Sequence, residues 1–468
     1  MSIKDEFCGY LKVDDDTYAY SVSNRIVTLL PAISDEKGRY DCFERMKQHN
    51  IAVPEFFYGN DTNYKIALMH IGKFFTDSLG LDVAVRFSTP VIVKACGNAS
   101  GFFETMSDSW EKFHAIEFHG GNINALYNPS IAKKSNKLDD LAGFDGAREI
   151  KMRPFKDYSL ETDFILNREK VKIKLSIRQS PEKQNKENYE AYNLGKLDSF
   201  IRFSFENAQG FETIEKYYLL ARRLVALLTV RNNVFFEHIY LTQRVSDDKY
   251  YRTAECKIFD AYVNYSEKNC FQVISLGSIW DSIPRIISAI QEDKVAPIFD
   301  VLPSDNKLVG KISIANVQDL CTAIEASYEL DKRKRKKDKT IEELKKSIKN
   351  TIEEFLVVNP EIDVYKKTTI SSSFKYLDYT LNTKILTLYN ENKGFVDLVI
   401  KKHFTPPIDD DTVAKFTKLR NAKTHAGTFE WGDSADIYWP LFAMVYVIYL
   451  KYTGVQEQTI KDLMEYVF

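Results

Sequence analysis

The sequence predicts an α+β protein, with a β-rich N-terminal region followed by a C-terminal all-α helical bundle. Segments rich in β-branched and aromatic residues occupy the first three hundred positions. Near position 305 the residue pattern changes. From there on, apolar residues recur three and four positions apart, as on one face of a helix. A chain of 468 residues is also too long for one hydrophobic core, so two or three domains are expected. We place the domain boundary between 1–305 and 306–468.

The N-terminal region is expected to consist mainly of strands. Residues 171–177 alternate apolar and polar side chains, which is typical of a strand with one buried face. Two segments, 213–230 and 278–293, have helical length and composition instead. A polar stretch at 128–150 would separate two β-rich lobes if this region is two domains rather than one. The segments that predict strands are 18–32, 64–75, 82–96, 168–180 and 270–277.

The C-terminal region is expected to be helical throughout. Its first helix has an apolar face marked by Val317, Leu320 and Ile324. The pair Pro406-Pro407 interrupts the helical pattern before residue 410. Further helical patterns cover 371–392, 394–404, 410–427 and 438–450.

The helix predicted from residue 410 carries the candidate site. Its N-terminus can be capped by Asp410, Asp411 or Thr412, which places negative charge at the positive end of the helix dipole. Gly427 is placed to end the helix. The apolar stripe of this helix is Val413, Phe416 and Leu419.

The sequence RNAKTH at 420–425 gathers three residues suited to cutting RNA without a metal ion or cofactor. His425 would take the proton of a ribose 2′-hydroxyl or give one to the leaving 5′-oxygen. Arg420 would hold the phosphate and stabilise its developing charge, and Asn421 would orient the phosphate or the ring. Arg420 lies about 140° around the helix from His425, so a second copy of the motif across a symmetric interface would help to complete the site.

Two other histidine patterns have simpler explanations. Arg231, Asn232 and His238 repeat the arginine–histidine spacing, but their surroundings predict a turn and a strand, where such side chains do not gather. His114 and His119 suggest a metal-binding pair, but five positions apart on a strand they point to opposite faces. We expect neither set to be a site, and no metal site is predicted.

Local basic charge beside the candidate site favours contact with RNA. The net charge is only -2, so any basic surface must be local. The run at 331–339 can follow a phosphate backbone, although a solvated helix face is the alternative explanation. The residues expected to bind RNA are Lys332, Arg333, Lys334, Arg335, Lys336, Lys337, Lys418 and Lys423.

The cysteine pattern and the N-terminal sequence indicate a cytoplasmic protein. The 6 cysteines are scattered, without a CxxC pair, as expected in a reducing compartment. The first ten residues lack the apolar core of a secretion signal. The longest apolar run, 438–450, is too short to span a bilayer, so no membrane partner is expected.

The C-terminal region resembles the HEPN superfamily, whose ribonucleases carry an arginine, four to six further residues and a histidine. RNAKTH matches this motif, and the following apolar segment resembles the helix that follows it in ApeA-like anti-phage proteins. In that family an upstream helix often bears an acidic residue facing the motif. The resemblance assigns this role to Glu325, with Glu329 one helical turn further on as the alternative.

The resemblance implies a metal-independent endoribonuclease of abortive infection. Its HEPN domain would form a homodimer and cut host RNA, with tRNA as the candidate substrate, once the N-terminal region senses a phage-derived trigger. HEPN domains also occur as inactive partners, so the alternative is a non-catalytic HEPN binding module that recognises a partner protein or RNA. Cleavage of tRNA in EDTA to products with 2′,3′-cyclic phosphate ends would separate the two.

Overall fold

The computed structural model divides the chain into two compact units, Met1–Gln291 and Glu292–Phe468. The first unit is built on a large antiparallel sheet and the second is helical, which confirms the α+β prediction. The predicted boundary between 305 and 306 lies inside the second unit. The residues that the structure describes are 3, 6–13, 16–33, 36–48, 50–61, 64–79, 82–96, 110–134, 151–152, 158–179, 197–246, 249–259, 273–308, 310–330, 339–360, 380–422 and 435–468.

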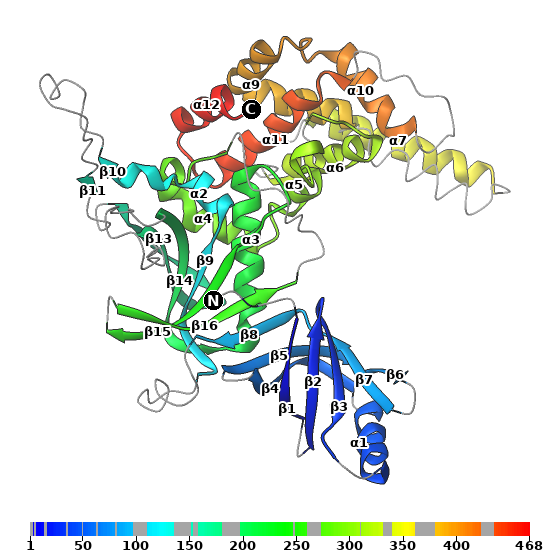
Figure 1. Cartoon of the computed structure of the whole chain (residues 1–468). Coiled ribbons are helices and arrows are strands. Elements are labelled where there is room, and N and C mark those ends of the chain that lie inside the picture. The colour runs from blue at the N-terminus through cyan, green and yellow to red at the C-terminus, as the bar shows by residue number, and fades with distance from the viewer. Residues whose placement is uncertain are drawn as a thin grey trace, which may run out of the picture. The chain divides into compact units, whose positions relative to one another are not determined.

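Fourteen strands of the described part of the first unit pair in one antiparallel sheet (Figure 1). Two further short strands, β10 (Lys133–Lys134) and β11 (Lys151–Met152), pair with each other. In sheet order the fourteen strands are β12 (Leu160–Leu166), β13 (Glu169–Gln179), β14 (Leu197–Gly210), β9 (Lys112–His119), β15 (His238–Ser246), β16 (Lys249–Ile258), β8 (Val91–Ala95), β5 (Tyr64–Lys73), β4 (Asn50–Asp61), β1 (Glu6–Val13), β2 (Asp16–Ser23), β3 (Ile26–Pro31), β7 (Asp82–Ser88) and β6 (Phe75–Leu79).

The predicted strand segments contain tight turns that the apolar pattern did not reveal. Segment 18–32 holds both β2 and β3, joined at Asn24 and Arg25, whose φ angles of 47° and 66° suit a two-residue hairpin. Segment 82–96 likewise holds β7 and β8, which pair with different neighbours. The strand predicted over 168–180 is β13.

One strand prediction is wrong in the part that the structure describes. Residues 273–275, within the predicted segment 270–277, form no strand. The backbone N–H of Ile274 instead donates a hydrogen bond to the carbonyl of Leu228, at 2.8 Å, near the end of a helix. That helix is α3 (Ile214–Thr229), and it lies where a helix was expected. The second expected helix is present as a 3-10 turn, Leu276–Ser282, followed by α4 (Ile283–Gln291).

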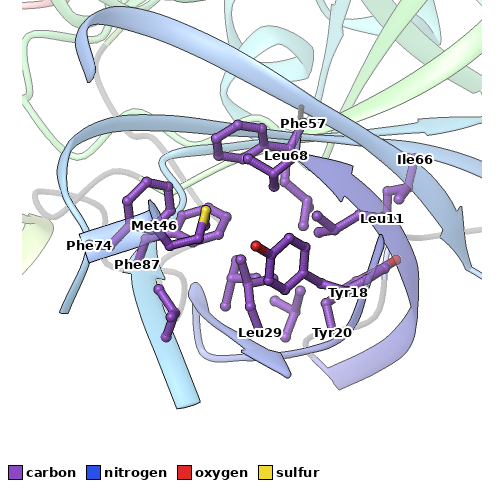
Figure 2. Close-up of a cluster of buried hydrophobic side chains, with 14 of the residues drawn as sticks. Leu11, Tyr18, Tyr20, Leu29, Met46, Phe57, Ile66, Leu68, Phe74 and Phe87 are labelled. Atoms are coloured by element: carbon purple, nitrogen blue, oxygen red, sulfur yellow. The ribbon is translucent and has the colours of Figure 1, made fainter. Parts of the chain in front are cut away.

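The N-terminal part of the sheet encloses its own apolar core. Tyr18 and Leu29 lie on paired strands, and helix α1 (Glu36–Gln48) adds Cys42 and Met46 to the same core. Figure 2 shows the rings of Phe57, Phe74 and Phe87 in this cluster, near Met46. The alternation of buried and exposed residues along β2 explains this arrangement, because every second side chain points to the same face.

The second part of the sheet buries one face under helices. Phe203 and Phe205 of β14 contact Tyr217 of α3, and α4 packs on β12. Strand β9 precedes the polar stretch at 128–150, yet it pairs with β14 and β15, which follow that stretch. Along the chain, the second group of strands therefore begins with β9, and in the sheet the two groups meet where β8 pairs with β16.

The second unit is a bundle whose central helix is apolar on all sides. This helix, α11, is buried along almost its whole length and packs against α9 and α6, as expected for a segment with no polar face. No helix among the described residues is both long and apolar enough to cross a membrane. The helices of this unit are α5 (Ala296–Val301), α6 (Ile314–Leu330), α7 (Lys339–Val358), α9 (Leu381–His403), α10 (Asp410–Ala422), α11 (Tyr438–Tyr452) and α12 (Glu457–Tyr466).

Helix α9 joins two segments that the sequence presented separately. The patterns at 371–392 and 394–404 belong, from residue 381 on, to one helix that runs through Gly394. A glycine inside a helix costs about 1 kcal/mol relative to alanine, and burial of the neighbouring Phe395 and Val396 offsets that cost. Residues 371–379 lie outside the described part of the chain.

Candidate functional site

The N-cap residue of helix α10 lies one position before the first of the candidates that the sequence suggested. The cap is Asp409, whose Oδ1 accepts a hydrogen bond from the backbone N–H of Thr412 at 2.9 Å. The backbone N–H of Asp409 in turn donates to the hydroxyl of Thr412 at 3.0 Å, so each residue satisfies a polar group of the other. The bonds from Thr412 lower the pKa of Asp409. The cap prediction of residues 410 to 412 is therefore wrong by one position.

The apolar stripe of α10 faces the bundle, as the sequence predicted. Val413, Phe416 and Leu419 are buried, and α10 packs against α6 and α9. Arg420 follows directly after Leu419, so its side chain starts at the edge of the packed face. The side chain of Arg420 is 36% exposed, which leaves part of the guanidinium open to a ligand.

Arg420 contacts the acidic residue that the resemblance singled out. Its Nη2 donates a hydrogen bond to Oε2 of Glu325 on α6 at 3.2 Å. A second link joins the same two helices, because the side-chain amide of Gln318 donates to the carbonyl of Arg420 at 3.3 Å. The two residues of the ion pair stand 95 positions apart in the chain. The packing of α6 on α10 thus brings Glu325 to Arg420.

A third charged residue, Lys384, joins this pair. Its Nζ lies 3.6 Å from the other carboxylate oxygen of Glu325, and its side chain is only 15% exposed. Lys384 comes from the first turn of α9, which starts at the capping residue Thr380. Little in the sequence pointed to this residue, since it stands next to the buried Ile385 in a region with many lysines. We call Arg420, Glu325 and Lys384 the helix cluster.

The helix cluster carries one surplus positive charge, because two cations share one carboxylate. Its ion pairs are partly exposed, so each contributes at most about 1 kcal/mol to stability. The neighbouring Cys321 is buried, and burial raises the pKa of its thiol to about 12 although Arg420 opposes that shift. Cys321 is therefore a neutral thiol at pH 7 and not a nucleophile. The cluster can hold an anion such as a phosphate group, and its guanidinium is the accessible donor.

The other predicted site residues fall into three groups. Lys418 lies exposed on α10. Asn421 lies in α10, but its side chain is not among those that the structure describes. His425, Lys423, Gly427 and the basic residues 332–337 lie outside the described residues.

The second arginine–histidine pattern has separate structural roles. Arg231 follows the end of α3 in the chain and is buried. Its Nη1 donates to the carbonyl of Thr229 at 2.8 Å. His238 opens β15, and its Nδ1 lies 2.9 Å from a carboxylate oxygen of Glu255. The sequence-based expectation of a turn followed by a strand is confirmed here.

The two remaining candidate histidines, His114 and His119, both lie on β9, as expected for a strand. Among the described residues, no three or more His, Cys, Asp or Glu side chains are grouped so that they could hold a metal ion.

Comparisons with protein-family models, with curated proteins and with solved structures found no match.

Proposed function

We propose that the second unit is a HEPN-type endoribonuclease domain and that the chain is an ApeA-like abortive-infection protein. The observation that supports this proposal is the hydrogen bond between Arg420 and Glu325. The sequence motif assigned Arg420 to the phosphate and the resemblance assigned an acidic partner on an upstream helix. The short motif alone has many chance occurrences, whereas a motif arginine held by that particular acid is a more specific arrangement.

The proposed reaction is attack of a ribose 2′-oxygen on the adjacent phosphorus. His425 takes the 2′-hydroxyl proton or gives a proton to the 5′-oxygen as the P–O5′ bond breaks, which leaves a 2′,3′-cyclic phosphate and a free 5′-hydroxyl. Arg420 donates hydrogen bonds to the phosphate oxygens as charge builds up on them. Asn421 orients the phosphate. The reaction requires the 2′-hydroxyl, so DNA is not a substrate.

Glu325 and Lys384 act on Arg420 rather than on the substrate. Glu325 fixes the direction of the guanidinium through one oxygen, while Lys384 holds the other oxygen. An incoming phosphate then meets a guanidinium that is already oriented, which reduces the entropy lost on binding. The basic residues 332–337, with Lys418 and Lys423, would bind the flanking RNA backbone.

The active unit in this proposal is a homodimer in the cytoplasm. On the helix that the sequence predicts over 410–427, Arg420 and His425 would start on different sides, so the motif of a second copy would complete each site. Following the resemblance, the first unit would sense a phage-derived trigger, and the second would cut host RNA, with tRNA as the candidate substrate.

The test uses one histidine variant and a matched control. Bacteria that express the full chain are infected with phage, and their RNA is examined for fragments with 2′,3′-cyclic phosphate ends. The purified chain is also incubated with tRNA in EDTA. Replacing His425 by Ala should lower cleavage by about 10²- to 10⁴-fold. His403→Ala is the control, because His403 lies in the same unit at the exposed end of α9 and contacts the carbonyl of Phe468.

Each outcome of this test has a clear meaning. Undiminished cleavage by the His425 variant would refute the assigned role of that residue. Products that disappear only on chelation would indicate metal chemistry. RNA that is bound but left intact in infected cells would favour the non-catalytic HEPN binding module.

A further inference from the structure

Five adjacent strands of the first unit, β13, β14, β9, β15 and β16, carry a row of charged side chains on one face. Alternate residues of these strands point to this face, and the residues between them, such as Phe118 and Phe203, pack in the core. The register places Arg202 opposite Glu117, and Tyr240 opposite Glu117 on its other side. We call this side of the five strands the charged face.

Glu117 lies at the centre of the charged face and is fully buried. The guanidinium of Arg202 donates to its Oε1 from Nε at 2.9 Å and from Nη2, so this oxygen is well satisfied. Burial alone would raise the pKa of Glu117. The hydrogen bond with His119 and the charges of Arg202 and Arg178 outweigh burial, so the pKa lies below its ordinary value. Glu117 is therefore ionised at neutral pH, and two N–H groups of Arg202 donate to one of its oxygens, which makes a strong charge-assisted pair.

Two more arginines reach Glu117 from opposite sides and bind it weakly. Arg178 comes from β13 and Arg252 from β16, the two outer strands of the five. Their Nη atoms lie 3.4 Å and 3.7 Å from Oε2 of Glu117, near or beyond the limit of a good hydrogen bond. About a third of each side chain is exposed, at 33% and 32%.

The geometry of Arg252 points to an absent acceptor. Its Nε is buried and has no hydrogen-bond partner among the described residues. Its guanidinium stacks 3.6 Å from the centre of the Tyr240 ring, which fixes the plane of the group, and Nη2 lies 3.4 Å from Nε2 of His119. Arg178 is similarly placed over the ring of Phe200. Both guanidinium groups thus lie over aromatic rings, and Arg252 has a buried donor without an acceptor in the described part of the chain.

Glu117 and Glu255 of the charged face are buried, Asp198 is 18% exposed, and all three acids already have partners. Glu117 pairs with Arg202, Asp198 accepts from Asn124 and contacts His119, and Glu255 contacts His238. The most accessible charged groups near Glu117 are therefore cations. Burial lowers the pKa of Arg178, and the like charges of Arg252 and Arg202 lower it further although Glu117 opposes them. An anion placed between Arg178 and Arg252 would relieve this repulsion.

We propose that Arg178 and Arg252 form a clamp on the charged face that binds the phosphate group of a phosphomonoester. A monoester carries up to two negative charges and three free oxygens, so it can accept hydrogen bonds from two guanidinium forks at once. A phosphodiester has one charge and two free oxygens and matches the pair less well. The bound group would bridge β13 and β16, and β16 also pairs with β8 of the N-terminal strands. The first unit would then have a ligand site of its own, independent of RNA cleavage.

The test titrates the full chain with inorganic phosphate and with 5′-AMP, observed by ³¹P NMR. Saturable binding at millimolar phosphate is expected, and Arg178→Gln and Arg252→Gln should each weaken it about tenfold or more. Arg252→Lys should also weaken binding, because it keeps the charge but loses the fork. Arg244→Gln is the matched control, since Arg244 is an exposed arginine of β15 that donates to the carbonyl of Glu206.

Two results would overturn the clamp. One is the absence of saturable binding of phosphate and 5′-AMP by the wild-type chain, which would leave the cluster as a purely structural network. The other is equal affinity of the Arg178, Arg252 and Arg244 variants. A single-stranded RNA without terminal phosphates serves as a third probe. Binding of that RNA, without binding of phosphate or 5′-AMP, that is lost in the Arg178 and Arg252 variants would assign the site to backbone phosphodiesters and refute the monoester proposal.

Discussion

The two units each contain a carboxylate shared by several cations, but solvent reaches them very differently. Glu117 in the sheet is fully buried and its main partner Arg202 is 9% exposed. Glu325 in the helix cluster is 34% exposed and Arg420 is 36% exposed. In the first case, removal of the acid leaves cations in a medium of low dielectric. In the second case, water can replace the lost partner. Burial, rather than the number of ion pairs, therefore sets the contribution of each cluster to stability.

The largest expected difference between the clusters is in stability. Glu117→Gln should lower the free energy of unfolding of the first unit by about 3–5 kcal/mol, because it leaves a buried arginine without its counter-charge. Hydrogen exchange of peptides from β9 and β14 in increasing urea measures this change locally.

Glu161→Gln is the matched control for this experiment. Glu161 lies on β12 of the same sheet, pairs with Lys174 and is 40% exposed, so its replacement should cost less than about 1 kcal/mol. Equal destabilisation by the Glu117 and Glu161 variants would contradict the role of burial.

A pH series sharpens the same comparison. The pKa of folded Glu117 lies below its ordinary value of 4.5, because His119 and the arginines outweigh burial. A lowered pKa in the folded state stabilises the protein above the unfolded pKa, and this contribution is lost as the pH falls from about 4.5 toward the folded value. The stability difference between wild type and Glu117→Gln should be constant from about pH 7 to pH 5 and shrink below about pH 4.5. A difference that stays constant or grows as the pH falls below about 4.5 would show that the pKa is not lowered.

The smallest expected change in stability belongs to the helix cluster. Glu325→Gln should alter the free energy of unfolding by less than about 1 kcal/mol, because water reaches both partners. If the proposed nuclease function holds, the same change should lower RNA cleavage by about tenfold or more by releasing Arg420 from its orientation.

The positioning role of Glu325 has its own controls. Glu325→Asp should restore part of the activity, since it keeps the charge. Glu329→Gln should leave cleavage unchanged, because Glu329 is the acid one turn further along α6 and Glu325 is the residue that contacts Arg420. Loss of cleavage in the Glu329 variant alone would reverse the assignment.

Part of the fold followed directly from local sequence patterns. The alternation in β13 and the stripe of Val413, Phe416 and Leu419 in α10 predicted which side chains are buried. Such patterns are reliable because a strand repeats every two residues and a helix every 3.6 residues, whatever the partner is. The strand predicted over 270–277 failed in its described part, because a short apolar run does not reveal whether its neighbour is a strand or a helix end.

The charged face could not be predicted in the same way. Glu117 and Arg202 are 85 positions apart, and nothing near either residue indicates that their strands pair. Lys384 likewise looks like any other lysine of its segment until α9 is packed on α6. The cap at Asp409 was missed because neighbouring aspartates fit the cap equally well in sequence.

By itself, the sequence determined which face the clearly periodic segments bury, such as β13 and α10, and it marked Arg420 as a residue suited to bind phosphate. The tertiary structure decided which buried faces meet, and so which charges share a carboxylate. The physical reason is the range of the information: periodicity is a property of neighbouring residues, whereas strand order and helix packing depend on how the whole chain buries its apolar surface.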